Sequence, residues 1–329
     1  MKRVIIDTDP GDDDAAAILF CLGSGVVQVE ALTITDGNVE MEKCARNALM
    51  ILEAAGRSDI PVYRGASKPL VRPSRHAKWI HGEDGLGDTN LPPPQSQVAE
   101  GYAALEIVRR VMESPEEITL LGLGGLTNLA LAISVEPRIK ERVKEIVVMG
   151  GAVRTGGNVT PVASFNIVID PEAAYIVYHS GIPIVQIGLD VCDRVVETDA
   201  HLAAIEQAHT PVTDFLIKVL EYRRTKAVMP VVGPRGEIRN IQSHIRNKPG
   251  STDVRLNDVV AAAYVIDPTL FRGEQMYVTI ETQGKETAGM TVGDFRGQLG
   301  QDPNATVLLG VDGQALADRW TRDIIRCGR

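Results

Sequence analysis

Short runs of valine, isoleucine and leucine, separated by longer helix-like stretches, limit most strongly which folds this chain can adopt. Each run is almost continuously apolar, which is typical of parallel strands that are covered on both faces. Five such strands are predicted at residues 4–7, 29–35, 118–124, 145–151 and 182–190. Helical composition occurs at residues 13–22, 39–55, 98–112, 128–134 and 171–180. The alternation predicts an α/β fold with a doubly wound, mostly parallel sheet and helices on both faces.

The domain organisation follows from the absence of any internal repeat or linker in the 329 residues. We therefore predict a single domain that spans residues 1–329. Residues 64–97 and 226–255 break the rhythm, because they contain glycine and proline without apolar periodicity. Long irregular segments of this kind often cover a site, so both are predicted to be active-site loops.

Composition excludes several classes of partner. The chain has 34 basic and 43 acidic side chains, a net charge of −9 that would repel nucleic acids and anionic membranes. Its longest apolar runs are shorter than the roughly 18–20 residues that cross a bilayer, and its N-terminus does not resemble a secretory signal. The four cysteines are far apart and form no CxxC pair. A cytoplasmic enzyme without nucleic-acid or membrane partners is expected.

Polar residues gather where the predicted strands end. The first strand runs into a segment from Asp7 to Asp14 that holds five carboxylates in eight residues. In parallel sheets, ligands bind beyond the carboxyl ends of the strands. The same edge should therefore also receive the polar groups that follow the other strands, namely Asp36-Gly37-Asn38, Thr127-Asn128, Asn158, Asn166, Asp190 and Asn257-Asp258.

The density of acids in the first segment points to a bound cation. Like charges about 4 Å apart repel by several kcal/mol at an effective dielectric constant near 20, and a cation relieves this. Oxygen ligands select hard ions such as Ca²⁺ or Mg²⁺. The simpler alternative is an exposed acidic turn whose aspartates cap the following helix.

One alternative enzyme class fits the end of the first strand. Asp7-Thr8-Asp9 resembles the DxD motif of haloacid-dehalogenase-type phosphatases, which implies a Mg²⁺-dependent enzyme with Asp7 as nucleophile. That motif normally continues into Gly-Thr, whereas Pro10-Gly11-Asp12 follows here.

A second resemblance covers most of the chain. The segment DTDPGDDDAAAI at residues 7–18 resembles the N-terminal fingerprint of inosine–uridine-type nucleoside hydrolases, whose DxDxxxDD pattern is met by Asp7, Asp9, Asp13 and Asp14. Further segments similar to this family follow in order at residues 37–38, 81–87, 124–128, 149–153, 165–174 and 257–268. The resemblance implies hydrolysis of the N-glycosidic bond of purine or pyrimidine ribonucleosides to ribose and free base, as in nucleoside salvage. It also implies a homodimer or homotetramer.

The resemblance assigns roles to individual residues. It implies that Ca²⁺ is held by Asp9, Asp14, Asp258 and the carbonyl of Leu123, with Asp7 supporting the ligands from behind. Asp9 would also remove a proton from the water on that ion. The ribose hydroxyls would be held by Asp13, Asn38, Asn158, Asn166 and Asp258.

One departure from the family affects the leaving base. Asn257 stands where the family often has a histidine that is proposed to protonate the base, and an amide is no general acid at neutral pH. His81, on the 64–97 loop, is the candidate substitute, and the simpler interpretation is a loop-closing or exposed histidine. Trp79 on the same loop is a candidate for stacking on the base or for ordinary packing. Tyr222, Arg223, Arg224 and Lys226 are candidates for lining the second irregular segment, and the simpler interpretation is a solvated helix end.

A second departure affects the sugar. Ser164 stands where the family usually has a glutamate that contacts the 5′ side of the ribose. The simple consequence is weaker ribose binding. The alternatives are a 5′-substituted nucleoside or phosphate with Arg154 as anion partner, or a family member that binds nucleosides without catalysis.

The assignment of Asp9 gives a direct test. Asp9→Ala should abolish turnover and leave the fold intact, because loss of a general base typically costs about 10²–10⁴-fold in rate. Base release and circular dichroism would be measured on the parent and the variant. A folded variant that keeps more than about a tenth of the activity would contradict the assignment.

Overall fold

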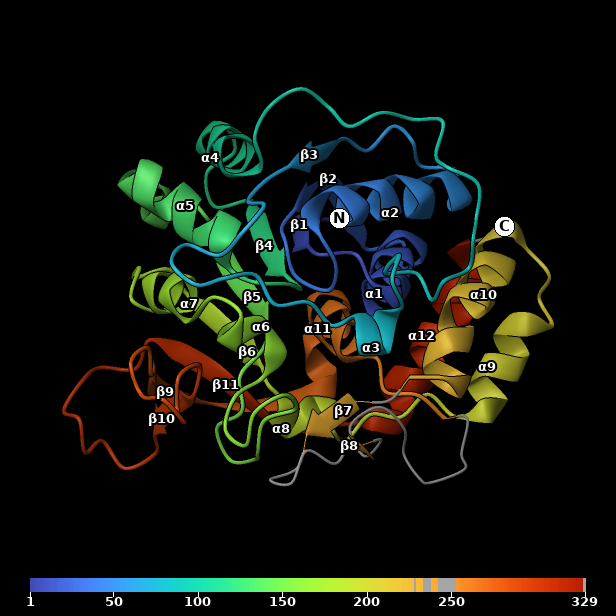
Figure 1. The fold of residues 1–329 in the computed structure, drawn as a ribbon. Coiled ribbons are helices and arrows are strands. Elements are labelled where there is room, and N and C mark those ends of the chain that lie inside the picture. The colour runs from blue at the N-terminus through green and yellow to red at the C-terminus, as the bar shows by residue number, and fades with distance from the viewer. Residues whose placement is uncertain (228, 233–237, 242–252, 328–329) are drawn as a thin grey trace.

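A nine-stranded sheet forms the centre of the chain (Figure 1). The computed structural model describes residues 1–227, 229–232, 238–241 and 253–327. Seven neighbouring strands run parallel, and the two further strands at one edge are joined to them and to each other by antiparallel pairing. In sheet order they are β10 (Thr291–Asp294), β9 (Phe271–Ile280), β11 (Ala305–Val311), β6 (Ile184–Ile187), β5 (Glu145–Met149), β4 (Ile118–Gly122), β1 (Lys2–Thr8), β2 (Val27–Ile34) and β3 (Val62–Arg64).

The predicted doubly wound α/β fold is confirmed. The five predicted strands correspond to β1, β2, β4, β5 and β6, and every residue of β4 and β6 is buried, as expected for strands covered on both faces. The prediction missed β3, which has three residues and is too short to show a period. The carboxyl ends of β1 and β4 lie side by side, because Asp7 pairs with Gly122 in the ladder.

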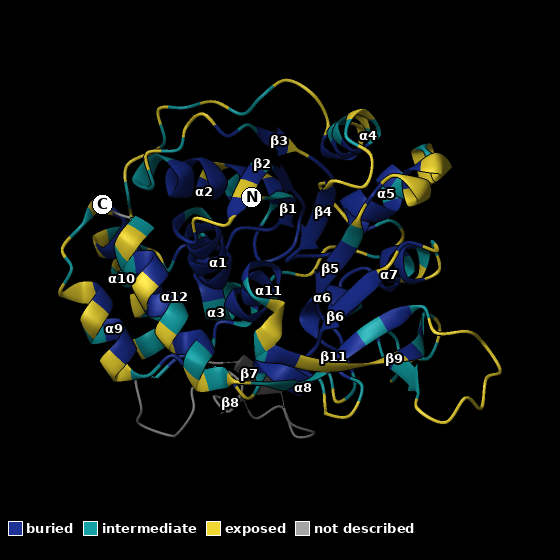
Figure 2. Ribbon diagram, turned by 180° about the vertical axis from the view of Figure 1, so that it is seen from behind, coloured by how far each residue is buried: buried dark blue, intermediate teal, exposed yellow. Residues whose placement is uncertain are grey.

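Helices cover both faces of the sheet (Figures 1 and 2). One hydrophobic cluster includes residues of α1 (Asp12–Gly23), α2 (Met41–Ala54), α10 (Pro211–Thr225), α11 (Asn257–Ile266) and α12 (Gly313–Cys327). The other includes residues of α4 (Ala103–Glu113), α5 (Thr127–Val135) and α7 (Pro171–Tyr178). The shorter helices are α3 (Lys78–His81), α6 (Phe165–Val168), α8 (Leu189–Cys192) and α9 (Asp199–Glu206).

Helix α1 is enclosed on all sides. Ten consecutive residues, from Asp12 to Cys21, are buried against α2, α10, α11 and α12. A helix that is covered all round needs no polar face, and Ala15, Ala16 and Ala17 let its neighbours approach closely. The helix begins shortly after β1 ends, so its acidic first turn lies at the carboxyl edge of the sheet, where the helix dipole favours negative charge.

The two predicted irregular segments have different outcomes. Segment 64–97 is irregular as predicted, apart from Arg64 at the end of β3 and the four-residue helix α3. In segment 226–255, residues 228, 233–237 and 242–252 lie outside the described residues. The described part contains an antiparallel pair that the prediction missed, β7 (Met229–Val232) and β8 (Ile238–Ile241). Among the described residues, no helix has the length and apolar character to cross a membrane.

Glu197 is a fully buried acid between α8 and α9. Its backbone pairs with Val254 through two hydrogen bonds of 3.0 Å, which ties this segment to the start of α11. Among the described residues, no side chain donates a hydrogen bond to its carboxylate. Burial raises the pKa of Glu197 to about 8, so the folded protein favours the protonated acid.

We expect Glu197 to make the free energy of unfolding fall as the pH rises. The folded pKa lies above the unfolded one, so this side chain loses its stabilising contribution between the ordinary glutamate pKa and about pH 8. Glu197→Gln mimics the protonated acid and should gain stability over the parent, on the order of a few kcal/mol, between pH 5 and pH 8. Urea unfolding of both proteins at the two pH values measures this difference.

The exposed Glu206 on α9 provides the matched control. Glu206→Gln should leave the pH dependence of unfolding unchanged. A difference between Glu197→Gln and the parent that is the same at both pH values would contradict a neutral Glu197.

Candidate active site

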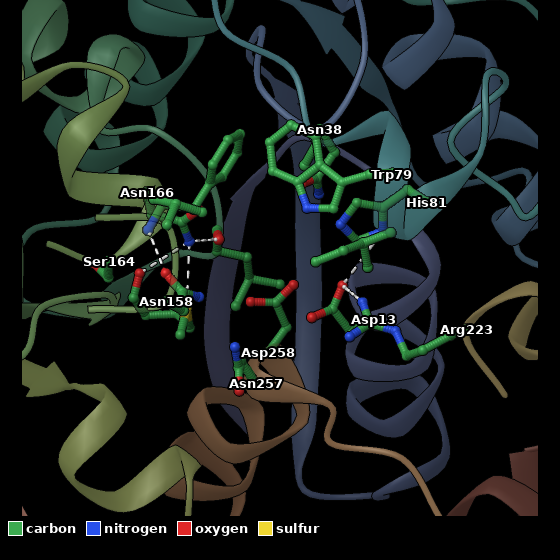
Figure 3. A pocket seen from close by; sticks show the side chains of 16 residues that line it. Asp13, Asn38, Trp79, His81, Asn158, Ser164, Asn166, Arg223, Asn257 and Asp258 are labelled. Carbon is green, nitrogen blue, oxygen red and sulfur yellow. Dashed lines mark hydrogen bonds and ion pairs between the residues drawn. The ribbon is translucent and has the colours of Figure 1, made fainter. Parts of the chain in front are cut away.

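A pocket lies at the carboxyl edge of the sheet (Figure 3). Asp13, His81 and Arg223 stand on one side of it, and Asn158, Ser164 and Asn166 on the other. The pocket is also lined by Asn38, Trp79, Leu123, Asn257 and Asp258. Of the site residues predicted from the sequence, all line the pocket except Asp7, Asp9 and Asp14, which are buried next to it.

Two helices deliver carboxylates to this pocket. Helix α1 begins at Asp12 and α11 begins at Asn257, and the two helices pack against each other. One carboxylate oxygen of each of Asp13, Asp14 and Asp258 lies within 4.8 Å of the others. Burial, and after it the neighbouring Asp14 carboxylate, raise the pKa of both Asp9 and Asp258 well above its usual range. The carboxylates of this cluster therefore repel one another.

The fit of a metal ion can be judged from the hydrogen bonds of these acids. The Oδ2 atom of Asp9 accepts the backbone N–H of Asn38 at 2.7 Å, but its Oδ1 atom is buried and has no partner among the described residues. Asp14 accepts hydrogen bonds from Thr8, from Gly11 at 2.9 Å and from the Asn38 amide at 3.0 Å, all neutral donors. Oxygen donors with excess negative charge suit a hard cation.

Asp13 differs from the other acids because a cation already faces it. Nη2 of Arg223 lies 3.0 Å from its carboxylate. Burial raises the pKa of Asp13 to about 6, although Arg223 and His81 act in the opposite direction. The acids that the structure groups as a possible metal site are Asp13, Asp14 and Asp258, and Arg223 already faces the first of these. The acidic-turn alternative holds in part, since Asp14 does cap α1 through Gly11.

Asn166 connects two strand ends. Its amide donates to the carbonyl of Leu123, just beyond β4, and at 3.1 Å to that of Met149 at the end of β5. Asn158 accepts the backbone N–H of Phe165 at 2.9 Å. These bonds fix the two amides at the pocket wall, where they can face a polar ligand (Figure 3).

The environment of Ser164 corrects the idea of a 5′-phosphate site. Its hydroxyl accepts the backbone N–H of Gly151 at 2.7 Å. The guanidinium of Arg154 lies 3.0 Å from Glu274 and over the ring of Phe295, at the exposed surface. Arg154 does not line the pocket, so the predicted anion partner is absent there.

Asp7 lies behind the pocket. Its Oδ1 atom accepts hydrogen bonds from Thr33 at 2.7 Å and Asn128 at 2.8 Å, and the residue is 1% exposed. Burial raises the pKa of Asp7 to about 7. A side chain that is enclosed in this way does not reach a substrate, which contradicts the alternative of a phosphatase with Asp7 as nucleophile.

The sequence interpretation missed an ion-pair network. Arg223 is buried instead of solvated, and its Nε and Nη2 atoms bind Asp12 at 2.7 and 2.6 Å. His81 binds the same carboxylate through Nδ1 at 2.6 Å. The only signal in the sequence was Asp12 itself, because an acid at the start of an enclosed helix needs a cationic partner.

Trp79 has the packing role that was one of its two predicted roles, and stacking on the base stays a prediction. It lines the pocket, and its ring packs edge to face against Phe165 with centroids 6.5 Å apart. Its indole N–H is buried and has no hydrogen-bond partner within the described part of the chain. The pocket wall beside His81 therefore presents an aromatic surface with one unused donor.

Comparison with known proteins agrees with this geometry. The family model described as inosine-uridine preferring nucleoside hydrolase matches residues 4–318. An inosine-uridine preferring nucleoside hydrolase from Leishmania major is 38% identical over 297 residues, which cover 90% of this chain and 88% of the relative. A non-specific ribonucleoside hydrolase, RihC, from Klebsiella pneumoniae (strain 342) is 40% identical over 323 residues, or 98% and 97% of the two chains. The structure of a purine-preferring ribonucleoside hydrolase from Gardnerella vaginalis has a TM-score of 0.89 and 29% identity, with 99% of both chains covered.

The carboxylate cluster predicts that Ca²⁺ stabilises the protein. After chelator treatment, CaCl₂ at 100 times its dissociation constant should add about 2.7 kcal/mol to the free energy of unfolding. Asp258→Asn should lose most of this gain, yet without metal it should be at least as stable as the parent at pH 7.5, because it removes a buried charge. Calorimetric melting of both proteins with and without CaCl₂ measures these effects.

The exposed Asp318 provides a matched control, and Asp318→Asn should respond to CaCl₂ as the parent does. An unchanged melting temperature of the parent on addition of CaCl₂ would contradict a calcium site.

Proposed function

Because the chain belongs to the inosine-uridine preferring nucleoside hydrolase family and is a ribonucleoside hydrolase, we propose that it cleaves both purine and pyrimidine ribonucleosides, with Ca²⁺ in the carboxylate cluster and Asp9 as the base. The observation that carries the proposal is the group of buried acids at the pocket: Asp14 and Asp258 lie together with Asp13, and Oδ1 of Asp9 has no partner among the described residues. The pocket above this floor is lined by Asn158 and Asn166, which suit a sugar.

The metal would be held by Asp9, Asp14, Asp258 and the carbonyl of Leu123. When bound, Ca²⁺ offsets part of the carboxylate charge and makes a coordinated water more acidic, though less so than zinc does. Support comes from the unpartnered Oδ1 of Asp9 and from the absence of any arginine or lysine bound to these three acids among the described residues.

Asp9 suits the role of base. The Asn38 N–H fixes one of its oxygens, so the other is free to accept a proton from the attacking water. The backbone around it is held close: an added Cβ at Gly37 or Gly124 would lie within 2.5 Å of an Asp9 oxygen. Glycine at these two positions leaves space for the Asp9 carboxylate.

The charge of the floor suits the transition state. Cleavage of a glycosidic bond develops positive charge on the sugar. Three carboxylates keep the floor net negative even beside a divalent cation, and burial makes this field strong. We assign the ribose hydroxyls to Asp13, Asn158 and Asn166. Asn38 contributes chiefly by orienting Asp9 and Asp14, because its amide already donates to both residues.

Breadth toward the base follows from the apolar part of the pocket lining. Trp79, Ile80, Val159 and Phe165 belong to it, and these side chains provide apolar surface instead of a set of base-specific hydrogen bonds. Apolar pockets discriminate weakly between ligands of related shape. The relatives named as inosine-uridine preferring and as non-specific hydrolases are consistent with this breadth.

The test is base release from a panel of nucleosides in phosphate-free buffer. Inosine and uridine should both give free base and ribose in equal amounts, and the 2′-deoxynucleosides should react at least about 10²-fold more slowly, because buried groups that hold a hydroxyl are left unpaired. Chromatography of the bases and a reducing-sugar assay measure both products.

Reaction that needs added phosphate would indicate phosphorolysis and contradict the proposal. Activity confined to either purines or pyrimidines would contradict the proposed breadth. Absence of base release from every nucleoside would refute the function itself.

A further inference from the structure

We propose that Asp12 positions His81 as the proton donor to the departing nucleobase and that Arg223 holds Asp12 in place. The inference rests on the proposed function, since it concerns the leaving group of that reaction. A departing base carries negative charge unless a proton reaches it, and Asn257, which lines the pocket, has no acidic proton to give.

The contact between His81 and Asp12 is short and enclosed. The Nδ1 atom of His81, at the end of α3, lies 2.6 Å from Oδ1 of Asp12, in the first turn of α1. Their exposed fractions are 4% and 0%. A short bond to a charged partner in a buried site is strong, so it fixes both the position and the rotation of the ring.

This contact decides which ring nitrogen is available. Since Nδ1 is directed to the carboxylates of α1, Nε2 is the atom that remains for a ligand. It has no hydrogen-bond partner among the described residues, and the ring lines the pocket next to Trp79 (Figure 3). An imidazole held at Nδ1 by a carboxylate and open at Nε2 is suited to give a proton at Nε2.

Arg223 explains how the chain tolerates Asp12 inside. Its Nε and Nη2 atoms bind the Asp12 carboxylate, and Nη1 donates to the carbonyl of Arg255 at 3.1 Å. Arg223 and His81 together occupy both oxygens of the Asp12 carboxylate. When His81 carries two protons, the carboxylates of Asp12 and Asp13 face two cations and the group is neutral.

Glycines in the backbone allow the His81 ring to approach Asp12. A Cβ added at Gly11 would lie 2.5 Å from Nδ1 of His81, so a larger residue there would displace the ring. Gly82, with φ at +77°, ends α3 directly after His81. The carbonyl of His81 accepts the N–H of Gly87 at 2.8 Å, which folds the loop back on itself. His81 is thus held from both sides and is no exposed loop residue.

The proton balance is simple. The glycosidic electron pair leaves with the base, which takes the proton from Nε2 of His81. The water oxygen bonds to the sugar carbon, and the proton of the water passes to Asp9. Ribose and a neutral base leave, and transfer of one proton from Asp9 through solvent to His81 restores the enzyme.

A change of leaving group separates this role from a structural one. We would compare inosine with p-nitrophenyl β-D-ribofuranoside, whose phenolate departs without a proton. For His81→Ala and His81→Gln, kcat on inosine should fall about 10²–10⁴-fold, the usual cost of losing a general acid. With the p-nitrophenyl riboside, kcat should stay within about threefold of the parent, since no acid is needed.

Asp12→Asn tests the positioning role. The amide keeps the size of the side chain and loses the charge that supports a protonated ring. On inosine, kcat should fall by about tenfold or more, while KM and turnover of the p-nitrophenyl riboside should change little. If this variant does not fold, the two His81 variants still decide the proposal.

The chain offers a matched control in a second histidine–carboxylate pair away from the pocket. The Nε2 atom of His201 on α9 lies 3.0 Å from Asp318 on α12. His201→Gln and Asp318→Asn should leave both substrates unaffected.

Equal losses on the two substrates, or no loss on inosine, would overturn the proposal. If the parent hydrolyses neither substrate, the proposed function has failed before the role of His81 is tested.

Discussion

The repulsion among carboxylates at the start of α1 is the interaction on which the rest of the site depends. Asp12, Asp13 and Asp14 are buried in consecutive positions, with Asp9 just before them and Asp258 opposite. Such a group persists only if cations compensate it. Arg223 compensates Asp12 and Asp13, whereas no arginine or lysine among the described residues pairs with Asp9, Asp14 or Asp258. The acidic segment therefore has two parts. Asp12 and Asp13 face Arg223, and Asp9 and Asp14 do not.

The fold makes this concentration of charge possible. Because β1 and β4 are neighbours and run parallel, their ends place Asp7 and Leu123 at one edge, together with the first turns of α1 and α11. The alanines of α1 allow α11 to pack closely, which brings Asp258 next to Asp14. The apolar clusters on both faces of the sheet stabilise the fold and so offset the free-energy cost of burying these charges.

The sequence predicted what depends on local pattern and short motifs. Buried parallel strands show as continuous apolar runs, so β1, β2, β4, β5 and β6 were found, and strand ends marked the pocket. The antiparallel pair β7–β8 and the three-residue β3 lacked such a pattern. The bond between Asp12 and Arg223 joins residues 211 positions apart, and no local rule relates them. A basic residue near a helix end has the same sequence signature whether it is solvated or, like Arg223, enclosed by acids.

The geometry of the pocket relates Asn257 on α11 to His81 on the loop. A base that departs from a sugar can be protonated from any side that its ring atoms face, so the donor need not lie on α11, where Asn257 stands. The loop that carries His81 approaches from the opposite side and needs a partner to fix its ring.

An acid at position 12 supplies that partner because the first turn of α1 already lies beneath the loop. The acid in turn requires Arg223, since a second buried negative charge beside Asp13 would otherwise add to the repulsion at the floor. Asp12, His81 and Arg223 thus form one unit in which Asp12 is the shared partner of the other two, so removal of Asp12 takes away the contact that fixes the His81 ring.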